Sequence, residues 1–371
     1  MKRVKFGDIV REVKIQVDRN NNPYPHYVAG DHMDSMDLTI RRKGCFATDD
    51  VGPAFIRIFK PGQVLYGSRR TYLKKIAVAD FEGICSNTTF VLETKDSNVF
   101  LQELLPFVML SDSFTKWSIS HSKGSTNPYV LFSDLANYEF TLPSLDEQKV
   151  LADKLWAAYR VKESYKKLLA AIDDMLKAKF MEMFGGLEKN GTIKDIIDTN
   201  ILSVKKSYSK DSLIEYIDIS SIDSTLHNVN GTTTYIVDNA PSRAQQCVQN
   251  GDILVSTVRP INRNIAVVNN TENNLVASTG FCVLRPISGY EKYILTIVVS
   301  DEFTQSMCDK ASGGVYPAVV NSDVLNYPIV LPDKNSLQKI SAIATQAEAT
   351  KESLRKSIEN IDQVIKSLIN Q

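Results

Sequence analysis

Basic side chains gather in three short stretches of the first half of the chain. These are Arg41-Arg42-Lys43, then Arg69, Arg70, Tyr72 and Lys74, and last the loop Lys123-Gly124-Ser125-Thr126-Asn127. An arginine can donate to guanine O6 and N7 at once, an asparagine can pair with adenine, and Lys, Ser and Thr hold phosphates. These residues are therefore candidates for contacts with a nucleic acid. The alternative is that they form solvated faces.

The second half of the chain carries a parallel set of candidates. Arg259, Asn262 and Arg263 form one group, and Lys205, Lys206 and Tyr208 form a second basic patch. With a one-residue slip, Arg69 aligns with Arg259, and this recurrence in one loop of both halves makes nucleic-acid contacts as well supported as a solvated face. The second half is otherwise rather acidic, so any basic face that it presents must be narrow.

The signals for catalysis and metal binding are incomplete. Asn127-Pro128-Tyr129 is similar to the Asn-Pro-Pro-Tyr loop of amino-methyltransferases, but the second proline and a glycine-rich cofactor strand are missing. Asp80 with Glu93-Thr94-Lys95 has the outline of a nuclease site, but Val283-Leu284-Arg285-Pro286 stands there in the second half. Metal-ligand spacing is missing for His26, His32, His121 and His227. We predict no catalytic residue, no cofactor and no metal.

A long amphipathic helix must position these loops. Residues 142–186 carry a seven-residue apolar repeat, formed by Leu155, Ala158, Tyr165, Leu169, Ile172, Leu176 and Met183. Ser144 or Asp146 can cap its start, and Gly185-Gly186 can end it. A helix of about 38 residues is about 57 Å long, so it needs a partner along its length.

The end of the chain supplies that partner. The same period recurs after Leu331-Pro332, at Ile340, Ile343, Ala347, Leu354, Ile361, Val364 and Leu368. We predict that residues 146–183 and 336–369 form an antiparallel coiled coil. The acid that precedes Gln148 has no counterpart before Gln338, which leaves the cap of the second helix open.

The second helix belongs to a larger internal repeat. A shift of 189 residues places Gly62 on Gly251 and Ser111-Asp112 on Ser300-Asp301. The same shift also matches the pairs Phe114 and Phe303, Gly124 and Gly313, Pro128 and Pro317, Tyr138 and Tyr327, and Leu142 and Leu331. The protein is therefore predicted to be a globular unit followed by a long helix, twice.

Each globular segment reads as a mixed, strand-rich α/β domain. Strand-like runs include 63–66, 76–79 and 89–92 in the first copy, and 251–255, 264–268 and 281–284 in the second. One helix is expected over 100–117 and another over 290–310. We predict four segments: a domain over 1–141, a helix over 142–186, a domain over 187–331 and a helix over 332–371.

Bulk composition limits the class of protein. The chain has 371 residues, 43% of them apolar, and no apolar run approaches the length of a membrane span. The five cysteines are odd in number and unpatterned, and MKRVKFGDIV lacks a signal segment, so a reducing cytoplasm is expected. A formal net charge of zero gives no global attraction for a polyanion, so nucleic-acid binding must rest on local patches.

The order of motifs resembles a known family. Gly251-Asp252-Ile253-Leu254-Val255 leads to Arg259, an Ala-Ser-Thr-Gly-Phe turn lies at 277–281, and the loop 312–314 is glycine-rich. Leu142-Pro143 and Glu147-Gln148 match the entry to the family's conserved helix. Arranged twice in one chain, these motifs resemble the specificity (S) subunit of type I restriction-modification systems.

The resemblance implies a function and partners. In that family each globular unit is a target-recognition domain that reads one half of a split sequence in double-stranded DNA. The helices set the spacing and dock methyltransferase (M) subunits, two being expected, and a restriction (R) subunit can accompany them. The chain would then be a non-catalytic recognition subunit. The alternatives are a stand-alone DNA-modifying enzyme and a coiled-coil scaffold without a nucleic-acid role.

Overall fold

The computed structural model describes residues 2–18, 21–270, 272 and 274–370. The chain forms two compact units. Unit 1 contains Met1–Lys166 and Arg355–Gln371, and unit 2 contains Lys167–Leu354. Each unit therefore takes residues from both halves of the sequence repeat.

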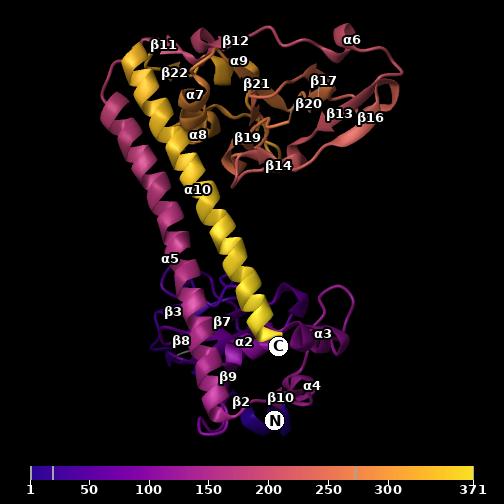
Figure 1. The fold of residues 1–371 in the computed structure, drawn as a ribbon, viewed down its shortest axis with the longest axis vertical. Helices are drawn as coiled ribbons and strands as arrows, with labels where there is room; N and C mark the ends of the chain where they lie inside the picture. The colour runs from indigo at the N-terminus through magenta and orange to yellow at the C-terminus, as the bar shows by residue number, and fades with distance from the viewer. Residues whose placement is uncertain (1, 19–20, 271, 273, 371) are drawn as a thin grey trace. The chain divides into compact units, whose positions relative to one another are not determined.

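Two long helices each contribute to both units (Figure 1). α5 spans Leu145–Phe184 and α10 spans Lys334–Ile369. Unit 1 contains the first half of α5 and the end of α10, whereas unit 2 contains the end of α5 and the first part of α10. The helices pack antiparallel, which confirms the predicted coiled coil.

The helix ends follow local capping rules. Glu147 accepts from the Ser144 N–H at 2.8 Å, and Ser144 Oγ accepts from the Glu147 N–H at 3.4 Å, a capping box at the start of α5. At the start of α10, the Asp333 carboxylate accepts from the Ser336 N–H at 3.0 Å. Asp333 thus caps the second helix in place of the missing acid. Gly186 has φ +82, the left-handed conformation expected after α5.

The apolar period of α10 changes near its end. Ile340 and Ala347 are buried as the seven-residue pattern predicts, but Val364 is 52% exposed and Ile365 is buried instead. The last turns of α10 pack on the globular core of unit 1 through Ile361, Ile365 and Leu368. Their spacing of four and three follows the 3.6-residue period of a helix on a globular core, so the prediction for Val364 was wrong.

Unit 1 is built from short strands and helices. Its strands are β1 (Lys2–Lys5), β2 (Val10–Val13), β3 (His26–Val28), β4 (Gly44–Cys45), β5 (Phe55–Phe59), β6 (Val64–Gly67), β7 (Ile76–Val78), β8 (Gly83–Ser86), β9 (Thr89–Thr94) and β10 (Glu139–Leu142). They form sheets in the orders β2-β9-β6-β7, β4-β3-β8-β5 and β1-β10. Its helices are α1 (Phe6–Ile9), the 3₁₀ turn η2 (Thr71–Leu73), α2 (Leu105–Leu110), α3 (Asp112–Ser120) and α4 (Phe132–Ala136).

Unit 2 has the same kinds of short strands and helices, with additional strands. Its strands are β11 (Gly191–Thr192), β12 (Ile197–Asp198), β13 (Leu213–Ile217), β14 (Ile222–Asp223), β15 (Asn228–Val229), β16 (Thr233–Ile236), β17 (Ala244–Cys247), β18 (Ile253–Ser256), β19 (Ile265–Val267), β20 (Leu275–Ser278), β21 (Phe281–Pro286) and β22 (Pro328–Ile329). They form sheets in the orders β12-β21-β18-β19-β15-β14, β16-β13-β20-β17 and β11-β22. Its helices are η3 (Ile193–Ile196), α6 (Val204–Ser207), η4 (Ile219–Ser221), η5 (Val237–Asn239), η6 (Pro260–Asn262), α7 (Glu291–Val298), α8 (Asp301–Lys310) and α9 (Asn321–Leu325).

The central strands of the two units have the same register. In β6, Val64 lies opposite Leu92 and Val78. In β18, Ile253 lies opposite Leu284 and Val267. Both units therefore hold the loop that follows this strand on the same backbone frame.

The helix expected in each unit is in fact two helices. A break occurs at Ser111 in unit 1 and at Ser300 in unit 2, because each serine side chain caps a new helix by accepting from Phe114 or Phe303 N–H. The predictions of single helices over 100–117 and 290–310 were therefore wrong. The break starts α3 and α8 at an aspartate, Asp112 or Asp301.

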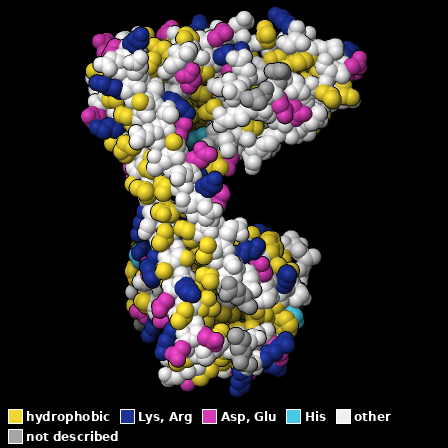
Figure 2. All heavy atoms as spheres, in the orientation of Figure 1, with side chains coloured by type: hydrophobic (Ala, Val, Ile, Leu, Met, Phe, Trp, Pro, Cys, Tyr) yellow, Lys and Arg dark blue, Asp and Glu magenta, His cyan; other side chains and the backbone are white. Residues whose placement is uncertain are grey.

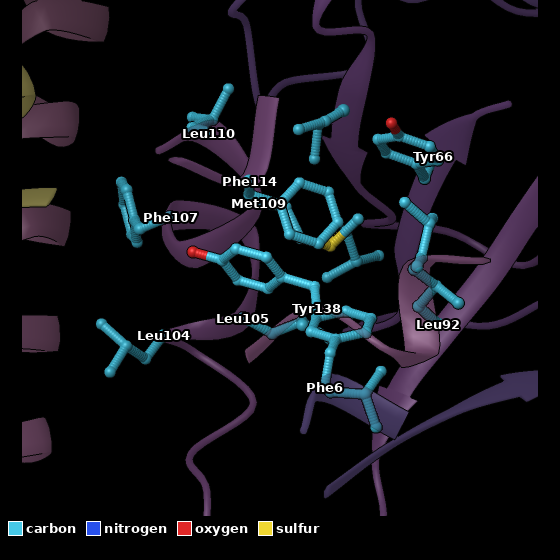
Figure 3. Close-up of a cluster of buried hydrophobic side chains, with 14 of the residues drawn as sticks. Phe6, Tyr66, Leu92, Leu104, Leu105, Phe107, Met109, Leu110, Phe114 and Tyr138 are labelled. Atoms are coloured by element: carbon cyan, nitrogen blue, oxygen red, sulfur yellow. The ribbon is translucent and has the colours of Figure 1, made fainter. Parts of the chain in front are cut away.

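Aromatic packing fixes α3 against the sheet of unit 1 (Figure 3). The Phe114 ring lies 5.2 Å from Phe6, 5.1 Å from Tyr138 and 6.1 Å from Tyr66, measured between centroids. These residues come from α3, α1, β6 and the segment before β10, and all are buried. The start of α3 is thus held in a defined position beside the loop that follows β6.

Candidate nucleic-acid interface

A strained turn follows β6 in unit 1. Arg70 and Lys74 have φ of 50 and 47 and bracket the 3₁₀ turn η2. Left-handed backbone is uncommon for residues other than glycine, and such strain persists where the surrounding structure holds it. Thr71 is buried under the turn, whereas Tyr72 at its apex is exposed.

The same turn follows β18 in unit 2. Arg259 and Arg263 have φ of 49 and 50 and bracket η6. These positions lie 189 residues after Arg70 and Lys74, without any slip. The predicted equivalence of Arg69 with Arg259 is therefore wrong, because the slip matched residue identity and ignored backbone conformation. The counterpart of Arg69 is Val258, since the two form corresponding bridges with Tyr129 and Ala318.

A tight hairpin is joined to each turn. In unit 1, Lys123 and Tyr129 exchange backbone hydrogen bonds of 2.8 and 3.0 Å around Gly124, whose φ is +86. In unit 2, Ser312 and Ala318 do the same at 3.0 and 2.9 Å. The Arg70 N–H donates to Pro128 O, and the Arg259 N–H donates to Pro317 O, both at 2.7 Å. We call each combination a tip: residues 69–74 with 123–129 form tip 1, and 258–263 with 312–318 form tip 2.

An aspartate anchors each turn from below. Lys74 Nζ donates to Asp112 at 3.2 Å, and the Arg263 guanidinium donates to Asp301 at 2.6 Å. The hydrogen bond from Lys74 lowers the pKa of Asp112. Lys177 of α5 and then Arg263 lower the pKa of Asp301 to about 2. Both carboxylates are therefore charged at neutral pH, and each holds the second left-handed residue of its turn.

The structure brings many of the predicted residues together at the tips. Arg69, Arg70 and Tyr72 are exposed on the turn of tip 1, and the hairpin presents Ser125, Thr126 and Asn127 beside them. Within the described part of the chain, no hydrogen bond or ion pair engages the side chains of Arg69 and Arg70. Those donors are free for a ligand.

Other predicted cations at the tips already have partners. Lys123 lies 3.2 Å from Asp134, and Lys74 and Arg263 hold the anchoring aspartates. The Arg259 guanidinium lies over the ring of Tyr316, with its Cζ 4.5 Å from the ring centroid, so a cation–π contact holds this side chain. Asn262 is exposed on the same turn.

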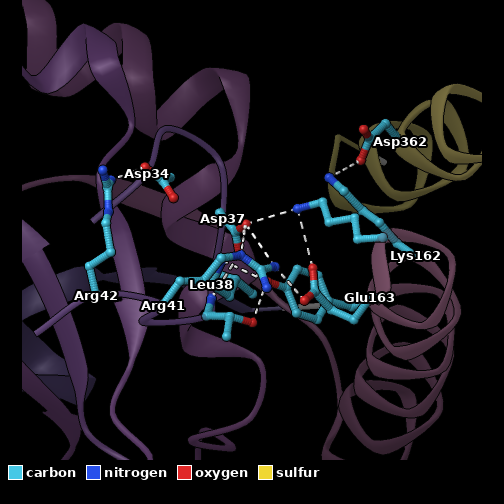
Figure 4. A network of polar contacts seen from close by, with 11 residues as sticks. Asp34, Asp37, Leu38, Arg41, Arg42, Lys162, Glu163 and Asp362 are labelled. Carbon is cyan, nitrogen blue, oxygen red and sulfur yellow. Dashed lines mark hydrogen bonds and ion pairs between the residues drawn. The ribbon is translucent and has the colours of Figure 1, made fainter. Parts of the chain in front are cut away.

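The Arg41-Arg42-Lys43 stretch belongs largely to an internal network (Figure 4). The Arg41 guanidinium donates through Nε and Nη2 to Asp37 and through Nη2 to Glu163, so part of its donor set is engaged within the protein. Arg42 pairs with Asp34, and Lys43 Nζ lies 5.0 Å from the Phe81 ring centroid. The contact of Arg41 with nucleic acid stays a prediction, and the sequence spacing did not show that the carboxylate of Glu163 on α5 engages this side chain.

The patch formed by Lys205, Lys206 and Tyr208 lies apart from tip 2. The two lysines are exposed on α6, which packs against β17, whereas Tyr208 packs on a small apolar cluster. Burial raises the pKa of Tyr208. Figure 1 shows α6 at the end of unit 2 opposite α8, the helix that anchors the tip.

The sequence analysis did not identify several residues that support the tips. Asp112 and Asp301 anchor the turns, and Tyr316 orders Arg259. Lys366 approaches Asp112 at 3.9 Å in unit 1, and Lys177 contacts Asp301 in unit 2. The 189-residue offset could have found both pairs, because it relates Asp112 to Asp301 and Lys177 to Lys366.

Charge is mixed over the visible surface of each unit. Figure 2 shows Lys and Arg side chains interspersed with Asp and Glu side chains on this face of both units. This face therefore shows no continuous basic patch on the described part of either unit. Among the described residues, no helix is long and apolar enough to cross a membrane, and no group of three or more His, Cys, Asp or Glu could hold a metal ion.

Comparison with known proteins gives one family and several relatives. A family model described as a type I restriction modification DNA specificity domain matches residues 55–173 and 188–363. The HindI type I restriction enzyme specificity subunit of Haemophilus influenzae is 28% identical over 136 residues, which cover 36% of this chain and 30% of the relative. The EcoDI specificity subunit of Escherichia coli is 25% identical over 188 residues, which cover 49% and 40% of the two chains.

The matched segments therefore span less than half the length of those two relatives. The chain is also similar in fold to solved structures. The crystal structure of a type I restriction-modification S subunit from M. genitalium matches 99% of this chain and 94% of that chain, with a TM-score of 0.55 and 12% identity. At this identity, the match concerns the fold alone.

Proposed function

Because the chain belongs to the type I restriction modification DNA specificity domain family, we propose that it is the DNA sequence-recognition subunit of a type I restriction-modification complex. Each unit reads one half of a bipartite site in double-stranded DNA. The long helices set the spacing and dock methyltransferase subunits, two per complex. The chain itself has no catalytic role and acts in the cytoplasm.

The observation that carries this proposal is the pair of tips. Their backbones are equivalent, since each has two left-handed basic residues, a hairpin and an anchoring aspartate. Their side chains differ: Tyr72 corresponds to Ile261, and Asn127 corresponds to Tyr316. The same backbone frame with two different sets of side chains suits a protein that uses similar elements to read two different half-sites.

The target-recognition domains are proposed to extend over residues 1–141 and 187–331, with the helical segments 142–186 and 332–371 as spacers. Methyltransferase subunits supply the cofactor chemistry and act on adenines of the recognised site. A restriction subunit joins this complex where cleavage occurs. DNA is then the substrate of the whole complex, and this chain determines the sequence at which the complex binds.

Genome-wide mapping of modified adenines tests the proposal. The full chain is co-expressed with the methyltransferase subunit from its own locus, in a host that lacks other adenine methylation. We expect modification at one split sequence, and none when either protein is expressed alone. Modification by this chain alone would favour a stand-alone enzyme. A chain that shifts no duplex DNA, with or without the methyltransferase, would favour a scaffold.

A second prediction follows from the proposal that α5 and α10 set the distance between the two half-sites. One heptad is inserted into both helices at the border of the units, after Lys166 in α5 and before Arg355 in α10. The ion pairs Lys162–Asp362 in unit 1 and Lys351–Asp173 in unit 2 remain intact on either side of the insertion. Seven residues add about 10 Å, which equals about three base pairs.

Adenine mapping should show the same two half-sites, with a spacer longer by about three base pairs. The matched control inserts the heptad into α5 alone, which breaks the register of the helices and should abolish modification. An unchanged spacer in the double insertion would contradict the spacing role of the helices, and altered half-sites would contradict the separate reading of each unit.

A further inference from the structure

An apolar side chain stands exposed at the apex of each tip. Tyr72 is 54% exposed in the middle of η2, and Ile261 is 68% exposed at the equivalent position of η6. The two positions are related by the same offset of 189 residues as the left-handed residues around them. Two different apolar residues therefore occupy one structural position.

The apex is held rigidly although its side chain has no partner in the apolar cores. Lys74 and Arg263 close the two turns and are tied to Asp112 and Asp301. The start of each turn is bonded to the neighbouring hairpin through Arg70 or Arg259. A strained backbone that the surrounding structure holds in place is typical of functional sites.

Charge beside the apex indicates the kind of partner. In tip 1, the side chains of Arg69 and Arg70 are exposed next to Tyr72, and no hydrogen bond or ion pair within the described part of the chain engages them. In tip 2, Arg259 is exposed and ordered by Tyr316 next to Ile261. An apolar apex flanked by guanidinium groups complements DNA, because its phosphates are anionic while the major groove offers the apolar C5-methyl group of thymine.

We propose that Tyr72 and Ile261 are specificity-determining residues that each select a thymine, one in each half-site, by apolar contact with its C5-methyl group. This inference rests on the proposed function and adds to it the base and the kind of contact. The hydroxyl of Tyr72 has no part in the selection. The flanking arginines supply phosphate or guanine contacts, and the apex supplies discrimination that needs no hydrogen bond.

A binding selection tests the inference with the full chain assembled with its methyltransferase subunit. The probes are duplexes in which both half-sites are randomised. For Ile261→Ala, we expect preference for thymine at one position of one half-site to fall about tenfold. Tyr72→Ala should do the same in the other half-site, while Tyr72→Phe should select the parent sequence.

Base analogues test the contact itself. In the parent sequence, replacing the selected thymine with deoxyuridine removes only the methyl group and should weaken binding by the parent complex about tenfold. The same replacement should leave binding by the matching alanine variant unchanged. Equal losses in the parent and the variant would overturn the methyl contact.

Matched variants separate this inference from general effects of apolar surface. Ile15 in unit 1 and Ile287 in unit 2 are exposed to a similar extent but lie outside the tips. Ile15→Ala and Ile287→Ala should select the parent sequence with parent affinity. If apex variants select as the parent does, the inference fails while the proposed function stands. If the parent complex selects no bipartite sequence, the proposed function fails and the inference fails with it.

Discussion

Replacing Asp37 with asparagine is expected to lower the free energy of unfolding of unit 1 by about 3 kcal/mol. The Asp37 side chain is buried and accepts from Tyr159 Oη at 2.6 Å and from Lys166 Nζ at 2.8 Å. Arg41 donates to the same carboxylate at 3.1 Å. The neutral amide would leave the two cations short of counter-charge and present donors to groups that already donate, so the loss should be large for one substitution.

Hydrogen exchange measured on the intact chain can locate this loss. Peptides from unit 1 should exchange faster in the Asp37→Asn variant, while peptides from unit 2 provide an internal reference. Asp34→Asn is the matched control, because the Asp34–Arg42 pair is largely exposed and should contribute less than about 1 kcal/mol. Equal protection of unit 1 in the parent and Asp37→Asn would contradict the role given to this network.

The same network predicts how stability depends on pH. Burial alone would raise the pKa of Asp37, but hydrogen bonds from Lys166 and then Tyr159 outweigh it and hold the pKa well below its ordinary value. A carboxyl group with a depressed pKa stabilises the fold fully above its unfolded pKa of about 3.9. The stabilisation of unit 1 by Asp37 should therefore be constant at neutral pH and fall as the pH drops below about 4. Asp37→Asn should lack this acid-sensitive part.

Local patterns and the internal repeat predicted the architecture well. The seven-residue period identified both long helices, and their order along the chain, each after a globular segment, predicted the antiparallel packing. The strands β6, β7 and β9 and their counterparts β18, β19 and β21 fall on the predicted runs, because buried β-branched and aromatic residues bounded by turns are typical of strands.

The errors concern features that depend on tertiary structure or on backbone angles. Val364 fits the seven-residue period, yet the globular core of unit 1 takes Ile365 instead. Arg69 matches Arg259 by residue type, but the left-handed φ shows that Arg70 is the counterpart. The contact of Arg41 with Glu163 was not predicted, because the two residues lie 122 positions apart along the chain. No local pattern contains such information.

The repeat extends to ion pairs that join different parts of the chain. In unit 1, Lys162 of α5 contacts Asp362 of α10, and in unit 2, Lys351 of α10 contacts Asp173 of α5, both at 2.5 Å. Each residue of one pair is related to a residue of the other by 189 positions. The helices therefore present the same charged contact in both units with their roles exchanged. The two tips thus have closely similar supports, so differences in what they bind must come from the tip side chains.

This equivalence leads to a prediction about Arg70 and Arg259. Arg70→Ala is expected to weaken binding to the recognised duplex by about 1–3 kcal/mol. Each alanine keeps the Cβ at a left-handed position, so the turn should retain its conformation. Arg259→Ala should have a similar effect in the other half-site. The two losses should add, because the residues lie in separate units with no shared partner.

Lysine variants distinguish base reading from phosphate contact. A guanidinium that pairs with guanine loses its two-pronged contact in Arg70→Lys, so the sequence requirement should relax at one position. A phosphate contact would survive largely in Arg70→Lys, whereas Arg70→Ala would weaken binding evenly and lower the salt slope by about one. Titrations of the full chain with its methyltransferase subunit at several salt concentrations measure both quantities.

Lys123 provides the contrast within tip 1. Its ammonium group is a point charge on an exposed hairpin and is shared with Asp134, so it should hold a phosphate rather than read a base. Lys123→Ala should therefore reduce affinity slightly without altering the selected sequence. If Arg70→Ala and Arg259→Ala both bound the parent duplex as tightly as the parent chain, with unchanged salt dependence, the tips could not be the DNA-binding surface. In that case the equivalent backbone conformation of the two tips would have a structural role only.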